Sequence, residues 1–174
     1  MNKIEILKSE KDGLKIKADI HRMAKEGWES ISEDDIQRLK WYGLFLRNPT
    51  PGFFMLRVRI PNGFSFSHQV RALCFIAETF GNGIIDITTR QQVQLRQLKI
   101  ENVPEVFDLL EEAGLTSTQT GMDNVRNIIG CPVAGLNPKE RVNAYAQVKA
   151  LTEHILNNSE FSNLPRKFNV AISG

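Results

Sequence analysis

The chain has 174 residues, of which 41% are hydrophobic and 24% are charged, and its formal net charge is +2. These values are typical of one globular domain or of two small ones that share a core. A charge so close to neutral argues against a general nucleic-acid-binding protein, which would carry a basic patch or tail. No apolar run has the length of a membrane span and the polar N-terminus lacks the apolar core of a signal peptide, so we expect a cytosolic protein or the mature form of an imported one.

The first 50 residues predict little regular structure beyond one helix. Residues 1–30 are polar and rich in lysine, and their weak periodicity predicts an extended or partly helical arm. Ser32 begins a helix because its hydroxyl precedes an acidic first turn, with Asp35 at the capping-box position, and Gly43 can end this helix. The segment 47–52 is rich in proline and glycine, which predicts a hinge and the first domain boundary.

Strands and helices alternate clearly in the next part of the chain. Strands are predicted at 53–60, 84–88 and 92–98. Amphipathic helices are predicted from Ser67 to Gly81 and from Asn102 to Gly114. This β-α-β-β-α order is that of a ferredoxin-like half-domain, so the predicted fold class is α+β.

The last part of the chain begins with a long loop. Residues 116–138 are rich in Gly, Asn, Thr and Pro, and loops of this kind often carry functional residues on a rigid scaffold. A helix over about 139–156 and a final strand at 167–172 are predicted to follow.

Three predicted strands carry cations or amides on one face and hydrocarbon on the other, because strand side chains alternate. The polar positions are Arg57 and Arg59 in the first strand, Arg90, Gln92, Gln94 and Arg96 in the run 86–100, and Lys167 and Asn169 opposite Phe168, Val170 and Ile172 in the last strand. An ordinary half-exposed strand also alternates in this way. The lack of acidic residues at these positions favours a second interpretation, in which the polar faces converge on a ligand with several carboxylates or phosphates.

The cysteines and histidines predict no complete metal site. Cys74 lies in a helical apolar pattern, where a buried small side chain is expected, and Cys131 lies in a Gly-Cys-Pro turn. Neither cysteine has the spacing of a metal-ligand pair, and the histidines are scattered along the chain.

Several stretches in order resemble the N-terminal part of the ferredoxin-dependent nitrite and sulfite reductases, which are sirohaem enzymes. The stretches are LKWYG (39–43), PGFFMLRVRIPNG (51–63), DITTRQQVQL (86–95), DNVRNIIGCPVAG (123–135) and FSNLPRKFNVAISG (161–174). The resemblance implies an N-terminal arm and helix at 1–50, the ferredoxin-like half-domain at 51–116, and the start of an α/β sirohaem-binding domain at 117–174. The family's 4Fe-4S cluster is held by cysteines that would lie beyond Gly174, and Cys131 does not match one of them.

The resemblance also implies which residues form the site. Sirohaem is an octacarboxylate, and arginine is suited to binding carboxylates in pairs of hydrogen bonds. By resemblance, the cofactor-binding residues are Arg57, Arg90, Gln94, Arg96, Arg126, Asn127, Lys167 and Asn169. Of these, Arg57, Arg126, Lys167 and Asn169 are placed at the catalytic, substrate-facing side, and Arg59 is a neighbour on the same strand face as Arg57.

The family contains two branches that reduce different anions. Arg96 and Asn169 match the nitrite branch, whereas the sulfite branch tends towards His and Lys at these positions. The resemblance therefore implies part of an assimilatory nitrite reductase, which converts nitrite to ammonia in a six-electron reduction with reduced ferredoxin as donor. A sulfite reductase fragment and a non-catalytic tetrapyrrole-binding module remain as alternatives.

The family also implies a place in the cell and partners. The complete enzyme is expected in the cytoplasm, or in the plastid stroma of a plant or alga, without contact to nucleic acid or a membrane span. The remaining C-terminal half of the enzyme would be its partner, and we expect the 174-residue chain alone to be inactive.

Overall fold

The computed structural model describes residues 2–173, and its N-terminal part is helical. The elements are α1 (Lys3–Glu10), the 3-10 helix η1 (Gly13–Asp19), α2 (Ile20–Glu26), η2 (Trp28–Ser30), α3 (Glu33–Leu39) and η3 (Lys40–Tyr42). The predicted helical character is confirmed, but these residues do not form an arm, because Leu7, Ile16, Ile20 and Met23 are each at most 2% exposed and belong to the main core. Their wide spacing hides the pattern in the sequence, while tertiary packing supplies the helical stability.

The predicted start and end of α3 and η3 are confirmed. The Ser32 hydroxyl accepts a hydrogen bond from the Asp35 amide at 3.1 Å. Gly43 follows η3 with a φ of +74°, and a Cβ there would lie 2.6 Å from the Arg57 carbonyl oxygen. The chain can therefore turn directly into the sheet only with glycine at this position.

A four-stranded antiparallel sheet is the centre of the molecule, in the order β1-β2-β4-β3. Its strands are β1 (Leu44–Arg47), β2 (Thr50–Val58), β3 (Ile85–Ile87) and β4 (Val93–Lys99). The sequence did not predict β1, and segment 47–52 is no hinge, since it contains the two-residue turn at 48–49 and the paired ends of β1 and β2. The run 86–100 is likewise not one strand, since a turn at 88–92 separates β3 from β4.

An irregularity in β4 changes which side chains face the core. Leu56 pairs with Leu95 and Phe54 pairs with Leu98, so β4 has one extra residue at this point. Gln97 takes up the bulge with a φ of +60°. As a result, both Leu95 and Leu98 are fully buried.

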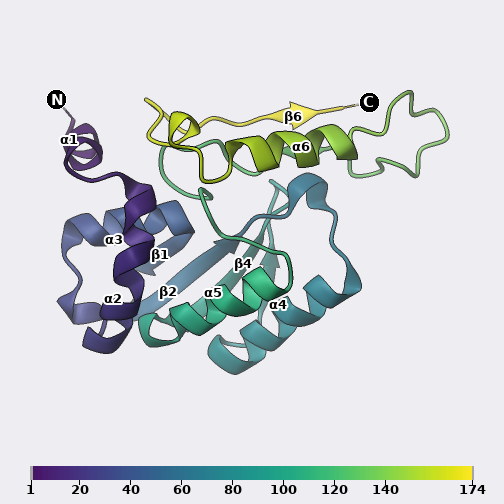
Figure 1. The fold of residues 1–174 in the computed structure, drawn as a ribbon. Helices are drawn as coiled ribbons and strands as arrows, with labels where there is room; N and C mark the ends of the chain where they lie inside the picture. Colours follow the sequence, from purple (N-terminus) through teal and green to yellow (C-terminus); the bar gives the residue numbers. More distant parts are fainter. Residues whose placement is uncertain (1, 174) are drawn as a thin grey trace.

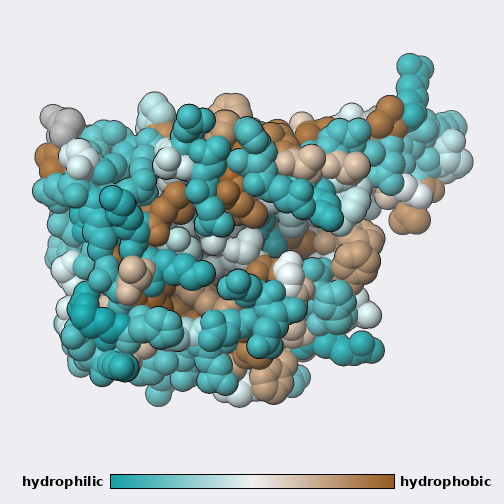
Figure 2. Space-filling model, viewed as in Figure 1, coloured by the Kyte–Doolittle hydropathy of each residue, from teal (hydrophilic) through white to brown (hydrophobic). Residues whose placement is uncertain are grey.

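Helices α4 (Ser67–Phe80) and α5 (Val103–Glu112) lie side by side against one face of the sheet, as Figure 1 shows. Helix α4 is followed by Gly81, as expected, and α5 has Pro104 in its first turn. Short 3-10 turns, η4 (Pro61–Gly63) and η5 (Ile100–Asn102), lead from the strands towards these helices. Figure 2 shows that the molecular surface in this view is mostly hydrophilic.

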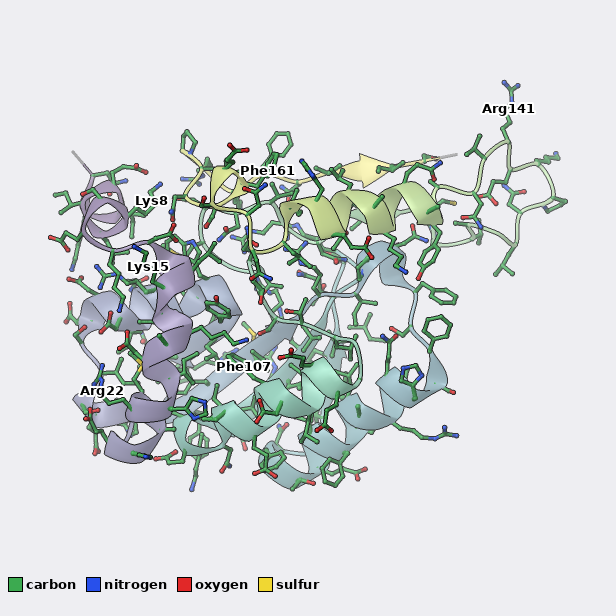
Figure 3. The ribbon with its side chains drawn as sticks, in the orientation of Figure 1. Lys8, Lys15, Arg22, Phe107, Arg141 and Phe161 are labelled. Atoms are coloured by element: carbon green, nitrogen blue, oxygen red, sulfur yellow. The ribbon has the colours of Figure 1, made fainter. Side chains whose placement is uncertain are left out.

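The last part of the chain forms a second, smaller core. It contains the short parallel strands β5 (Ile129–Gly130) and β6 (Ala171–Ile172), helix α6 (Tyr145–Ile155) and the turn η6 (Ser159–Phe161). Helix α6 begins later than predicted, and the loop before it projects from the body with Arg141 pointing away (Figures 1 and 3). The predicted strand at 167–172 is reduced to its last residues, and Phe168, predicted to be buried, is 58% exposed.

Two buried polar contacts join the N-terminal helices to this second core. The Trp41 indole, which is fully buried, donates to the Ser162 hydroxyl at 3.0 Å. The Lys8 ammonium donates to the Leu164 carbonyl at 2.9 Å and lies 3.3 Å from the Asp123 carboxylate.

Within residues 2–173, no helix has both the length and the apolar character needed to cross a bilayer.

Candidate functional site

The candidate site lies on the face of the sheet opposite α4 and α5. Arg57 in β2 pairs with Gln94 in β4, and Gln94 pairs with Asp86 in β3, so these residues form a row across the sheet. Their neighbours Leu56 and Leu95 are fully buried in the main core. Because side chains alternate along a strand, the row faces away from the helices.

Arg57 and Arg126 converge on one backbone oxygen. The Arg57 guanidinium donates to the Thr120 carbonyl at 3.1 Å, and the Arg126 guanidinium donates to the same oxygen. The Cζ atom of Arg57 also lies 4.8 Å from the centre of the Phe45 ring, which is a favourable cation–π contact. Two side chains that are far apart in the sequence are thus held together by the loop that carries Thr120.

Arg90 completes a cluster of three arginines that lack acidic partners. Within residues 2–173, no carboxylate lies within salt-bridge distance of Arg57, Arg90 or Arg126. Burial, together with the charges of Arg57 and Arg90, lowers the pKa of Arg126 to about 10, although Asp123 acts in the opposite direction. Burial and the charge of Arg90 also lower the pKa of Arg57. We name Arg57, Arg90 and Arg126 the arginine cluster.

Arg59 lies beneath the cluster and has a structural role. It is 1% exposed, and its guanidinium donates to the carbonyls of Arg126 and Gln119 at 2.9 Å and of Val125 at 3.0 Å. Burial and the charge of Arg126 lower the pKa of Arg59 to about 10. Both terminal nitrogens of its guanidinium donate to this loop, which indicates a structural role for Arg59.

Gln94 and Arg96 lie at the β3 side of the same face. Arg96 forms an ion pair with Asp86 and donates to the Gln94 side-chain oxygen at 3.4 Å. In contrast to the arginine cluster, Arg96 therefore has an acidic partner that neutralises its charge. Gln92, expected on this face, is instead 2% exposed and buried.

Asn127 is buried and its amide nitrogen faces the protein backbone. It donates to the carbonyls of Ile60 at 2.8 Å and Arg90 at 2.9 Å, and its side chain is 1% exposed. These contacts fix the turn that carries Arg90 and occupy the amide donors that a cofactor would need. In this structure the Asn127 amide nitrogen supports the turn that carries Arg90, and its role in cofactor binding stays a prediction.

Lys167 and Asn169 lie in the segment that runs beside Arg126. The Arg126 amide donates to the Phe168 carbonyl at 2.9 Å, and the Phe168 amide donates to the Asn124 carbonyl at 3.1 Å. Strand alternation places Lys167 and Asn169 on the side of Arg126, opposite Phe168, and both side chains are exposed. The structure thus brings together Arg57, Arg90 and Arg126, with Lys167 and Asn169 at their edge.

Sequence reasoning missed two contributors to this site. One is the Thr120 carbonyl, which no side-chain pattern reveals. The other is Gln91, which lies in the same run as Arg90 but forms no part of a strand. Its unusual backbone conformation, with a φ of +54°, is visible only in the structure.

No metal site is formed by the described residues. Within residues 2–173 no cluster of three or more His, Cys, Asp or Glu side chains could hold a metal ion. Cys74 and Cys131 are free and half-buried, so Cys74 is less buried than expected. The arrangement of the site suits the binding of an anion with several carboxylates instead.

Two family models match the chain. The nitrite/sulfite reductase ferredoxin-like half domain matches residues 47–113, and the nitrite and sulphite reductase 4Fe-4S domain matches residues 121–174. The ferredoxin-like fold class predicted from the sequence is thereby confirmed.

Known proteins are similar over the whole chain. The ferredoxin–nitrite reductase of Leptolyngbya laminosa is 50% identical over 180 residues, which cover 100% of this chain and 35% of the relative. The chloroplastic ferredoxin–nitrite reductase of Arabidopsis thaliana is 41% identical over 188 residues, covering 100% of this chain and 32% of the relative. The solved structure of the Mycobacterium tuberculosis NirA protein has a TM-score of 0.90 at 30% identity and covers 96% of this chain and 34% of that protein.

These likenesses concern a part of longer proteins. The chain spans about a third of the length of the curated relatives that it matches. Because the two matching models describe successive parts of the same enzymes and together match most of the residues, the chain belongs to the nitrite and sulphite reductase family.

Proposed function

We propose that the chain is part of an assimilatory ferredoxin-dependent nitrite reductase and that its arginine cluster binds the carboxylates of sirohaem. The observation that carries this proposal is the set of three arginines without an acidic partner among residues 2–173. Burial and neighbouring arginine charges lower the pKa values of Arg57 and Arg126, so these guanidiniums are costly to hold beside Arg90 without an anion. A bound octacarboxylate would supply that negative charge.

The residues of the chain fit sirohaem but not a 4Fe-4S cluster. Arg57, Arg90 and Arg126 offer free guanidinium donors on one face, which matches a ligand edged with carboxylates. A 4Fe-4S cluster needs four thiolates, and the chain has only Cys74 and Cys131. In this proposal, the rest of the enzyme therefore supplies the cluster ligands.

Each residue has a role that follows from its position. Sirohaem, when bound, would supply the redox chemistry for reduction of the anion, and the residues of the chain would supply binding and charge. Arg57, Arg126 and Lys167 attract the anion, neutralise the negative charge that develops as N–O bonds break, and keep protons within reach. Asn169 lies at the same edge and offers a neutral donor, which suits a small monoanion such as nitrite. Reduced ferredoxin is the electron donor in this proposal, and the enzyme works in the cytoplasm or the plastid stroma.

The cofactor role can be tested on the 174-residue chain with uroporphyrin, a metal-free octacarboxylate porphyrin. We expect absorbance titration to show binding that is tighter than for the tetracarboxylate coproporphyrin and that weakens with added salt. Arg126→Gln should weaken uroporphyrin binding about tenfold, the equivalent of about 1.4 kcal/mol. Arg22→Gln, an exposed arginine paired with Glu26, is the matched control and should bind as the wild type does. Equal affinity for both porphyrins, or no binding by the wild type, would refute the proposed site.

The catalytic role can be tested in a chimaera. The chain would replace the matching 35% of the Leptolyngbya enzyme, and nitrite reduction would be followed with reduced methyl viologen. Lys167→Ala should lower kcat at unchanged sirohaem content, and Arg126→Ala should lower kcat per bound sirohaem, because both residues are assigned to the anion and only Arg126 also to the cofactor. Wild-type turnover in both variants would remove these residues from the catalytic site.

A further inference from the structure

Gln91 adopts a strained backbone conformation next to the arginine cluster. Its φ of +54° lies in the left-handed region, which is uncommon for residues other than glycine, asparagine and aspartate. Such strain persists only where the surroundings hold the residue in place, and it is concentrated at functional sites. Gln91 is not a member of the cluster, so its conformation needs a separate explanation.

The side chain of Gln91 is bound to the backbone of β5. Its amide nitrogen donates to the Gly130 carbonyl at 3.0 Å, and its amide oxygen accepts from the Gly130 amide at 3.1 Å. The side chain thus pairs with Gly130 as a neighbouring strand would. Gly63 leaves room for it, because a Cβ on Gly63 would lie 3.1 Å from three Gln91 carbon atoms.

Asn127 strengthens the same connection from the other side. Its amide nitrogen donates to the Arg90 carbonyl at 2.9 Å and to the Gln91 carbonyl at 3.2 Å. The turn itself is closed by the Gln91 amide, which donates to the Thr88 carbonyl at 3.0 Å. The backbone of Arg90 is therefore fixed to the segment 127–130, a short distance along the chain from Arg126.

We propose that Gln91 is a positioning residue that holds Arg90 against Arg126, so that the two guanidiniums bind one polyanion together. Arg90 is exposed and lies in a turn, so no strand pairing fixes its backbone. The paired hydrogen bonds of Gln91 supply that restraint before the ligand arrives, which lowers the ordering cost of binding. This inference rests on the proposed binding of a carboxylate-rich cofactor by the arginine cluster.

A double-mutant cycle on the 174-residue chain, with uroporphyrin as the probe, tests the inference. Gln91→Met keeps the length of the side chain but loses both hydrogen bonds, and it should weaken binding about fivefold, while Arg90→Gln should weaken binding about tenfold. If Gln91 acts through Arg90, the double variant should bind about as weakly as Arg90→Gln alone. Gln97→Met is the matched control, because Gln97 also has a positive φ of +60° but is exposed in the β4 bulge.

The possible failures can be told apart. Unchanged binding by Arg90→Gln, or none by the wild type, would refute the proposed polyanion site and the inference with it. Weaker binding by Arg90→Gln with normal binding by Gln91→Met, or fully additive losses of about fiftyfold, would refute only the positioning role.

A second readout does not depend on a ligand. Hydrogen exchange at the Gly130 amide should be faster in Gln91→Met and in Gln91→Ala than in the wild type, with far-UV circular dichroism unchanged. Unchanged protection of Gly130 in both folded variants would overturn the inferred restraint.

Discussion

The substitution Ile16→Ala tests whether the first 30 residues belong to the core. Ile16 lies in η1 with no exposed surface. The substitution removes three carbon atoms, and at about 0.8 kcal/mol for each the lost transfer free energy is about 2.4 kcal/mol. The cavity that remains adds to this loss, so the free energy of unfolding should fall by about 3–4 kcal/mol.

Ile6→Ala provides the matched control. Ile6 lies in α1, in the same part of the chain, but its side chain is 43% exposed. The same atoms are removed with little loss of burial, and alanine favours the helix, so the free energy of unfolding should change by less than about 1 kcal/mol.

Urea denaturation followed by circular dichroism is a suitable assay. With an m-value of about 2 kcal/mol/M, Ile16→Ala should lower the midpoint by about 1.5–2 M, in a single transition. A midpoint shift no larger than that of Ile6→Ala would contradict the packing of η1 in the main core. A separate early transition would show that the N-terminal helices unfold independently of the sheet.

Three further predictions concern a buried phenol, a close backbone contact and an ion pair. Burial and the charge of a nearby aspartate raise the pKa of Tyr42 to about 12. Since an unfolded tyrosine ionises near 10, the free energy of unfolding should fall as the pH rises from 10 to 12, by about 1.4 kcal/mol at pH 11. Ultraviolet titration of Tyr145→Phe, which leaves Tyr42 as the one tyrosine, should show no ionisation below pH 11. Gly121→Ala should lower the free energy of unfolding by about 1–3 kcal/mol in urea melts, because the new Cβ would lie 2.1 Å from the Lys40 carbonyl oxygen; wild-type stability would disprove this contact. Asp86→Asn should tighten uroporphyrin binding about threefold, since it frees the paired β4 arginine, and an unchanged affinity would place that arginine outside the site.

The sequence predicted the central part of the fold well because its signals there are local. The strands and helices between residues 53 and 114 have apolar side chains at regular spacing, and glycines lie at the helix ends. The N-terminal helices could not be predicted in the same way. Leu7 and Ile16 are too far apart for a periodic pattern, and their burial depends on tertiary packing in the main core.

The candidate site was predicted in part. Alternation correctly separated Arg57 from the buried Leu56, and the arginine cluster lies where converging polar faces were expected. Alternation could not tell which face of the last segment packs inward, so Phe168 was wrongly assigned to the core. Nor could it show that the amide donors of Asn127 are used by backbone carbonyls, because those partners come from other parts of the chain.

The buried contacts of Lys8 have a consequence for the order of folding. Its ammonium binds the Leu164 carbonyl, which lies 156 positions later in the chain. At about 5–20 residues per second, a ribosome would need roughly 8–30 s to make the intervening residues. Until Asp123 and then Leu164 have been made, α1 lacks the partners that its lysine contacts in the folded chain. The first helix to be synthesised is thus among the last to reach its final packing. The hydrogen bond from Lys8 to the Leu164 carbonyl also fixes the backbone close to Lys167, which lies at the edge of the candidate site.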